Sequence, residues 1–134
     1  MARLEIRLAE AGAALATLDE AAENAAQSSI ARDSAILRLI YTFEAVWKAC
    51  QAVLAERENV EVASPNGAIR ATRRLGWLSD EDADAAMQIG RDRNLAVHMY
   101  RGQIGDEIRQ RLAGHSGVLH RWLAALRQRT GAEE

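Results

Sequence analysis

The spacing of large apolar residues between Asp33 and Glu58 constrains the fold most. They recur alternately every four and every three residues, which places them on one side of an α-helix packed at a shallow angle against its neighbours. At this spacing, apolar and aromatic residues usually form core rather than a cofactor site. No segment alternates between apolar and polar residues as a half-buried strand does, so the sequence predicts an all-α protein. The residues of this stripe are Ile36, Ile40, Phe43, Trp47, Cys50 and Leu54.

The N-terminal quarter of the chain carries a second helical stripe. Leucines and alanines from Leu4 to Ala25 recur at spacings of three, four or seven and predict a helix over residues 3–26. The Gln27-Ser28-Ser29 stretch that follows either ends this helix or only distorts it locally.

Capping residues predict two more helices. Ser64 before Pro65 is typical of an N-cap and a first helical residue, and this short helix should stop at Gly76. Ser79, followed by three acidic residues, predicts a fourth helix that ends at Val97 or Met99.

The fifth helix is expected over residues 106–129, after Gly102 and Gly105 loosen the chain. Four long helices and one short one, joined by short connections, predict an antiparallel up-down bundle. The length of 134 residues fits one domain, 1–134.

Composition narrows the class of protein. The net charge of −2 and pI near 5.9 argue against a generally basic nucleic-acid-binding protein, although six arginines face only two acidic residues between 101 and 130. Cys50 is the only cysteine, which fits a reducing cytoplasm. The charged N-terminus is unlike a signal peptide, and no apolar run is long enough to span a membrane.

The segment from Arg91 to Tyr100, RDRNLAVHMY, is the most informative in the chain. Asn94 and His98 are four residues apart, so they share a helix face and could form a hydrogen bond. Arg91 and Arg101 are expected to extend this polar face. Such a stripe suggests a helix that lines a cleft or an interface.

Arg93 and His98 form an Arg-x4-His pair that suits phosphodiester cleavage. Histidine can move a proton near neutral pH, and arginine can stabilise negative charge on phosphate oxygens. Five residues are about 140° of rotation, so the two side chains converge only where the helix ends or where a second chain closes the site. Taken alone, the pair is better explained by a structural ion pair at Arg93 and a helix cap at His98 than by catalysis.

Several blocks beyond this motif make the chain resemble the nucleotidyltransferase substrate-binding-like family of the HEPN superfamily, which includes HepT toxins. The resemblance covers residues 32–126, and its last block is similar to the R-x4-H-x-Y signature of HepT. The matching blocks are Arg32-Asp33, Tyr41-Thr42-Phe43-Glu44 with Trp47-Lys48, Ala63-Ser64-Pro65 with Ile69-Arg70, Gly76-Trp77-Leu78, Asp80-Glu81-Asp82, and Asp92-Arg93-Asn94-Leu95 with His98 and Tyr100.

The resemblance implies a homodimer whose two R-x4-H motifs face one cleft and cleave RNA without a metal or cofactor. Arg93 and His98 would be catalytic, with Asn94 as a supporting polar residue. A minimal nucleotidyltransferase antitoxin would silence the toxin by adding AMP units to Tyr100. The alternative is a non-catalytic subunit that presents substrate to a nucleotidyltransferase.

Other polar residues have a structural and a functional interpretation. Glu44 and Lys48 are spaced as a helix ion pair, or they border the dimer cleft. Arg70, together with Arg91 and Arg101, either lies on a solvated face or contacts substrate. His115 and His120 lack the neighbours of a metal site, so no metal is expected.

Overall fold

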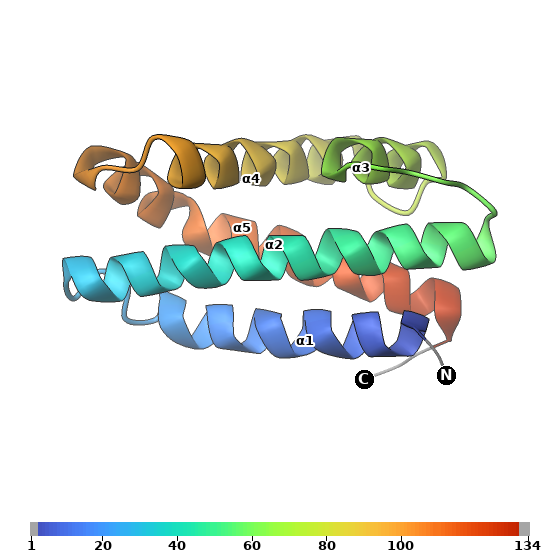
Figure 1. The fold of residues 1–134 in the computed structure, drawn as a ribbon, viewed down its shortest axis with the longest axis horizontal. Coiled ribbons are helices and arrows are strands. Elements are labelled where there is room, and N and C mark those ends of the chain that lie inside the picture. The colour runs from blue at the N-terminus through green and yellow to red at the C-terminus, as the bar shows by residue number, and fades with distance from the viewer. Residues whose placement is uncertain (1–2, 132–134) are drawn as a thin grey trace.

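The computed structural model describes residues 3–131, which form an antiparallel bundle of four long helices and one short one (Figure 1). In one layer the first two helices run antiparallel, and the third and fourth cover the opposite side. The fifth crosses between these layers, so the predicted all-α, up-down architecture is confirmed. The helices are α1 (Arg3–Ala22), α2 (Ser29–Arg57), α3 (Pro65–Arg74), α4 (Asp80–His98) and α5 (Gly102–Thr130).

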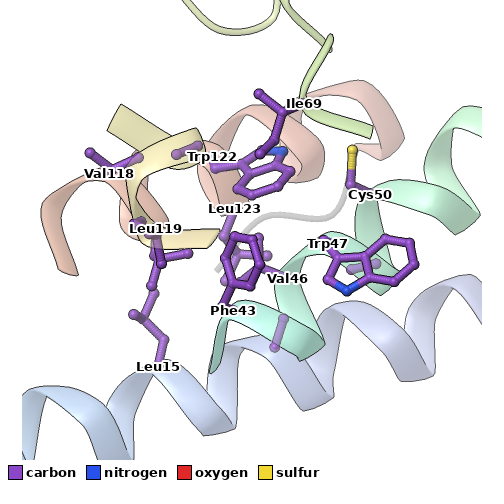
Figure 2. Packing of buried hydrophobic residues seen from close by; sticks show 14 of the residues in the cluster. Leu15, Phe43, Val46, Trp47, Cys50, Ile69, Val118, Leu119, Trp122 and Leu123 are labelled. Carbon is purple, nitrogen blue, oxygen red and sulfur yellow. The ribbon is translucent and has the colours of Figure 1, made fainter. Parts of the chain in front are cut away.

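The core gathers along the predicted stripe of α2. Phe43 and Trp47 are almost fully buried, and Phe43 packs against Trp122 of α5 with ring centroids 6.4 Å apart and planes tilted by 60°. Figure 2 shows Ile69 of α3 above Trp122 and Leu15 of α1 on the opposite side, so four helices share this cluster. Cys50 is also buried, as expected of a core residue.

Local capping explains where the middle helices begin and end. Ser64 and Ser79 are N-caps, and their hydroxyl oxygens accept hydrogen bonds of 3.0 Å from the backbone N–H groups of Gly67 and Asp82. Gly76 follows α3 with a φ of 80°, a left-handed conformation that glycine adopts without strain. These three predictions are confirmed.

The predicted boundaries of α1 and α2 are wrong by a few residues. Helix α1 stops at Ala22 and is followed by turns, so the chain does break before α2. Helix α2 begins at Ser29 instead of Asp33, because Ser28 is its N-cap and accepts from the Ala31 N–H at 3.0 Å.

Helix α5 begins four residues before the predicted Asp106. The two glycines that were expected to loosen the chain lie inside its first turn. Ile104 and Gly105 are both buried there, so packing outweighs the weak helix propensity of glycine.

Candidate functional site

The motif occupies the C-terminal half of α4. Arg93 is half-buried, and its Nη1 donates a 3.1 Å hydrogen bond to Asn94 Oδ1. His98 is the last residue of the helix and is exposed. Within residues 3–131 its imidazole has no hydrogen bond, so the expected Asn94–His98 bond is not formed.

Asp92, between Arg91 and Arg93, points the other way and is fully buried. Its carboxylate accepts hydrogen bonds from Arg111 at 2.9 and 2.7 Å and lies 2.6 Å from His115 Nε2, both on α5. Burial alone would raise the pKa of Asp92, but the hydrogen bonds to His115 and Arg111 outweigh it and hold this pKa well below its ordinary value. Because successive helical residues differ by about 100°, anchoring Asp92 against α5 turns Arg93 away from it.

Tyr100 lies just beyond α4 and is held against the start of α2. Its hydroxyl donates a hydrogen bond to the Asp33 carboxylate, and the Arg32 guanidinium lies 5.9 Å from its ring centroid. Burial and the hydrogen bond to Asp33 raise the pKa of the phenol. A Cβ on Gly105 would lie 2.3 Å from the phenol oxygen and 2.9 Å from Arg32 Nε, so this packing needs glycine there.

Arg32 connects the polar residues around Tyr100. It lies 3.0 Å from Asp33 and 3.1 Å from Asp106, so it joins the starts of α2 and α5. These two partners hold its pKa above the ordinary range of arginine. Tyr100 is therefore held in place by its contacts with Asp33 and Arg32.

A cavity of about 330 Å³ opens between α2, the start of α3 and α4. Phe43, Trp47 and Met87 form its apolar walls. Its polar lining includes Glu44, Asn66, Arg91, Arg93 and Asn94. Of the two expected catalytic residues only Arg93 lines this cavity, while His98 lies further along α4, as expected from their 140° separation.

The two arginines at this cavity form hydrogen bonds with neutral side chains. Arg91 donates to the neutral Gln88 amide at 3.1 and 2.9 Å, and Arg93 to the neutral Asn94 amide. No carboxylate among residues 3–131 lies within ion-pair distance of either guanidinium. Arg111 and Arg121, by contrast, are paired with Asp92 and Asp82. The cavity therefore has unneutralised cations suited to an anion.

The other expected substrate-binding residues are not gathered at this cavity, apart from Glu44. Glu44 accepts a 2.7 Å hydrogen bond from Trp47 Nε1, and Lys48 Nζ lies 6.0 Å from the Trp47 ring centroid, so the predicted Glu44–Lys48 ion pair is not formed. Arg70 is exposed on α3. Arg101 is the residue before α5, so it does not extend the polar face of α4 as expected.

The remaining histidines have structural partners. His120 Nε2 lies 2.7 Å from Asp19 of α1, and His115 lies against Asp92. In residues 3–131 no cluster of three or more histidine, cysteine or acidic side chains could hold a metal ion. No helix in this part of the chain is long and apolar enough to cross a membrane.

Sequence reasoning missed the partners that hold the motif. Arg111 lies 19 residues after Asp92, and Asp33 lies 67 before Tyr100, so no local spacing points to either contact. The one available signal was the position of Asp92 between two arginines, because a carboxylate flanked by cations can mark an internal pair.

Solved structures support the fold. A protein from Thermus thermophilus is 45% identical, with a TM-score of 0.83 over 87% of this chain and 98% of that one. A tri-AMPylated Shewanella oneidensis HEPN toxin, solved with its MNT antitoxin, is 16% identical, with a TM-score of 0.78 over 96% and 99%. A toxin–antitoxin structure with AMP-PNP is 15% identical, with a TM-score of 0.76 over 94% and 99%.

No curated protein sequence is similar enough to count as a match. The family model described as nucleotidyltransferase substrate binding protein like matches residues 6–128. That span covers nearly the whole bundle, including α4 and Tyr100. The chain therefore belongs to the nucleotidyltransferase substrate-binding-like family, and the resemblance seen in its sequence is confirmed.

Proposed function

We propose that this protein is a metal-independent RNA endonuclease of HEPN type, the toxin of a pair whose antitoxin is a minimal nucleotidyltransferase. The observation that carries the proposal is the presence of an arginine and a histidine near the C-terminal end of α4. Arg93 holds an unneutralised charge at a cavity, and His98, five residues on, has an exposed imidazole. Both groups could act on a phosphodiester once a second chain brings them together, and the cleavage needs no metal.

The reaction would use the ribose 2′-hydroxyl as nucleophile. Its oxygen forms a bond to the adjacent phosphorus while its proton leaves, the bond from phosphorus to the 5′-oxygen breaks, and that oxygen takes up a proton. His98 serves as the acid or the base, and Arg93 stabilises the charge that builds on the non-bridging oxygens. The products carry a 2′,3′-cyclic phosphate and a 5′-hydroxyl.

A second copy of the chain would bring the two groups together. Tyr100 and Asp33 join the end of α4 to the start of α2, and both segments carry large apolar side chains that are at least 45% exposed. An apolar surface beside the motif suits a homodimer in which each motif faces its mate. These side chains are Ile30, Leu37, Tyr41, Val97 and Met99.

The Leu37→Glu variant is expected to be a monomer at micromolar concentration, because it places a charge in this apolar surface without disturbing the core. Leu75→Glu is the matched control, since Leu75 is similarly exposed but lies at the end of α3. Sedimentation velocity measures both. A dimeric Leu37→Glu variant, or a wild-type monomer, contradicts this interface.

Tyr100 would be the site at which the nucleotidyltransferase silences the toxin. Its phenol oxygen attacks the α-phosphorus of ATP, pyrophosphate leaves, and Asp33 is placed to accept the phenol proton. The fold is that of a toxin solved in tri-AMPylated form with its MNT antitoxin, which supports this part of the proposal. The phosphate added to Tyr100 would lie next to Arg32.

Co-expression with a nucleotidyltransferase encoded beside this chain is expected to add one or more AMP masses to the wild type and none to Tyr100→Phe. Tyr41→Phe is the control, because Tyr41 is the only other tyrosine and is more exposed. Intact-mass spectrometry followed by peptide mapping locates the modification. AMP on Tyr100→Phe, or on Tyr41, rejects the assignment.

The alternative is a non-catalytic subunit that binds substrate for the nucleotidyltransferase. The family description favours it, and so does the separation of Arg93 from His98 within one chain. Expression in bacteria separates the two. The ribonuclease arrests growth and fragments cellular RNA, and His98→Ala does neither, whereas a binding subunit leaves growth unchanged in both forms.

A further inference from the structure

We propose that the cavity between α2, α3 and α4 is a nucleotide subsite, which seats one unpaired base of the RNA and holds its phosphate on Arg91 and Arg93. This inference rests on the proposed ribonuclease function and gives that site a substrate-reading pocket. It assigns a ligand class to this cavity, of which the proposed catalysis uses only Arg93.

The size of the cavity fits this ligand. Its volume of about 330 Å³ lies at the lower end of the ~300–1,000 Å³ usual for small-molecule sites. That is room for one nucleotide and too little for a helical segment of RNA. Proteins that read RNA sequence commonly bind single-stranded bases that are splayed out into such pockets.

The lining matches a nucleotide part by part. Phe43, Trp47 and Met87 offer an apolar wall for the flat face of a base. Glu44 and Asn66 are polar groups that can bond to its edge. Glu44 Oε1 already accepts from Trp47 Nε1 at 2.7 Å, so the carboxylate is held in place and keeps further lone pairs for a base N–H.

The charges match the phosphate. Arg91 and Arg93 bond only to neutral amides among residues 3–131, and Glu44 is the one carboxylate of the lining. The N-terminus of α3, at Pro65 and Asn66, also faces the cavity, and its dipole adds positive potential. Arg93 belongs both to this cavity and to the catalytic pair, so the nucleotide seated here would be next to the scissile bond.

Gly90 keeps the cavity open. A Cβ added there would lie 3.5 Å from Phe43 Cζ and 4.0 Å from Asn66 Oδ1, which are ordinary contact distances. The backbone therefore tolerates a side chain, and a large one would project among the lining residues. Leucine is also a better helix former than glycine, so Gly90→Leu should fill the cavity and leave the helix intact.

The test is an NMR titration of the full-length, ¹⁵N-labelled protein with 3′- and 5′-mononucleotides of all four bases, and with inorganic phosphate. Trp47 lines the cavity and its indole N–H donates to Glu44, another lining residue, while Trp77 and Trp122 do not line it. We expect at least one mononucleotide to shift the Trp47 signal selectively, and about tenfold more weakly or not at all in Gly90→Leu. Gly114→Leu is the control, because a Cβ at Gly114 meets nothing within 4 Å.

Two results overturn the subsite. One is a wild-type protein whose Trp47 signal responds to no mononucleotide, or only as it responds to inorganic phosphate. The other is a Gly90→Leu variant that binds like the wild type. Should Gly90→Leu fail to fold, Arg91→Ala takes its place, with the same loss of nucleotide binding expected.

RNA cleavage separates this inference from the proposed function. A protein that cleaves RNA but fails the titration is a ribonuclease without this subsite. A protein that binds mononucleotides at Trp47 but cleaves no RNA keeps the subsite and loses the ribonuclease.

Discussion

Replacing His98 by alanine is expected to lower the rate constant of RNA cleavage by about 100-fold or more, the usual contribution of a general acid or base. His98 is exposed at the end of α4, so its loss leaves the core and the Asp92 anchor untouched. Single-turnover cleavage of a labelled RNA measures the effect. Thermal unfolding should be unchanged within the error of the measurement.

His120→Ala is the matched control for that experiment. His120 is the other exposed histidine of residues 3–131, but it pairs with Asp19 on a different side of the bundle. Its replacement should leave the cleavage rate close to that of the wild type. A His98→Ala variant that still cleaves, or a His120→Ala variant that does not, contradicts the assignment of the catalytic histidine.

The largest loss of stability is expected from Asp92→Ala, at about 2–4 kcal/mol in the free energy of unfolding. The carboxylate is fully buried, and removing it leaves His115 and Arg111 facing a cavity without their partner. Urea denaturation followed by circular dichroism measures the change.

Asp82→Ala is the control, since Asp82 also joins α4 to α5 through two hydrogen bonds from an arginine, Arg121. That pair is solvent-exposed on the arginine side, so it should contribute about 1 kcal/mol or less. Equal losses in the two variants would show that burial gives the Asp92 contact no special weight.

Acid should remove the contribution of Asp92. The pKa of this carboxyl is lowered in the folded state, so its stabilisation is complete above the unfolded value of about 4 and falls as pH drops below it toward the lowered pKa. The stability difference between wild type and Asp92→Asn should therefore shrink below about pH 4. A difference that grows in acid contradicts the direction of the shift.

Helix α4 thus combines two roles through the rotation between neighbouring residues. Asp92 turns inward and fixes the helix against α5, and Arg93 turns toward the cavity. Any rotation of α4 that freed Asp92 would also move Arg93 from the cavity. We therefore expect substitutions of Asp92 to reduce RNA cleavage as well as stability.

Local signals in the sequence predicted most of the fold. The stripe from Ile36 to Leu54 identified the central helix, because apolar spacing directly reflects which side of a helix is buried. Ser64 and Ser79 marked helix starts through side chains that reach only three residues along the chain. The start of α5 was wrong because Gly105 packs closely against Arg32, which lies far away in the sequence.

The site was predictable only where it depends on residues that are close together in the sequence. The motif pointed to Arg93 and His98, and their separation around the helix followed from spacing alone. The roles of Asp92 and Asp33 could not be predicted, because their partners come from α5 and from beyond α4. Nor could the cavity, which needs three helices packed in their final positions.

The most direct test of the central claim is to incubate purified, dimeric protein with RNA in the presence of a metal chelator and to identify the product ends. Mass spectrometry first establishes that Tyr100 carries no AMP. The account predicts cleavage that leaves 2′,3′-cyclic phosphate and 5′-hydroxyl ends, and that is lost in Arg93→Ala and His98→Ala. Intact RNA in all three reactions would contradict the ribonuclease and favour the substrate-binding subunit.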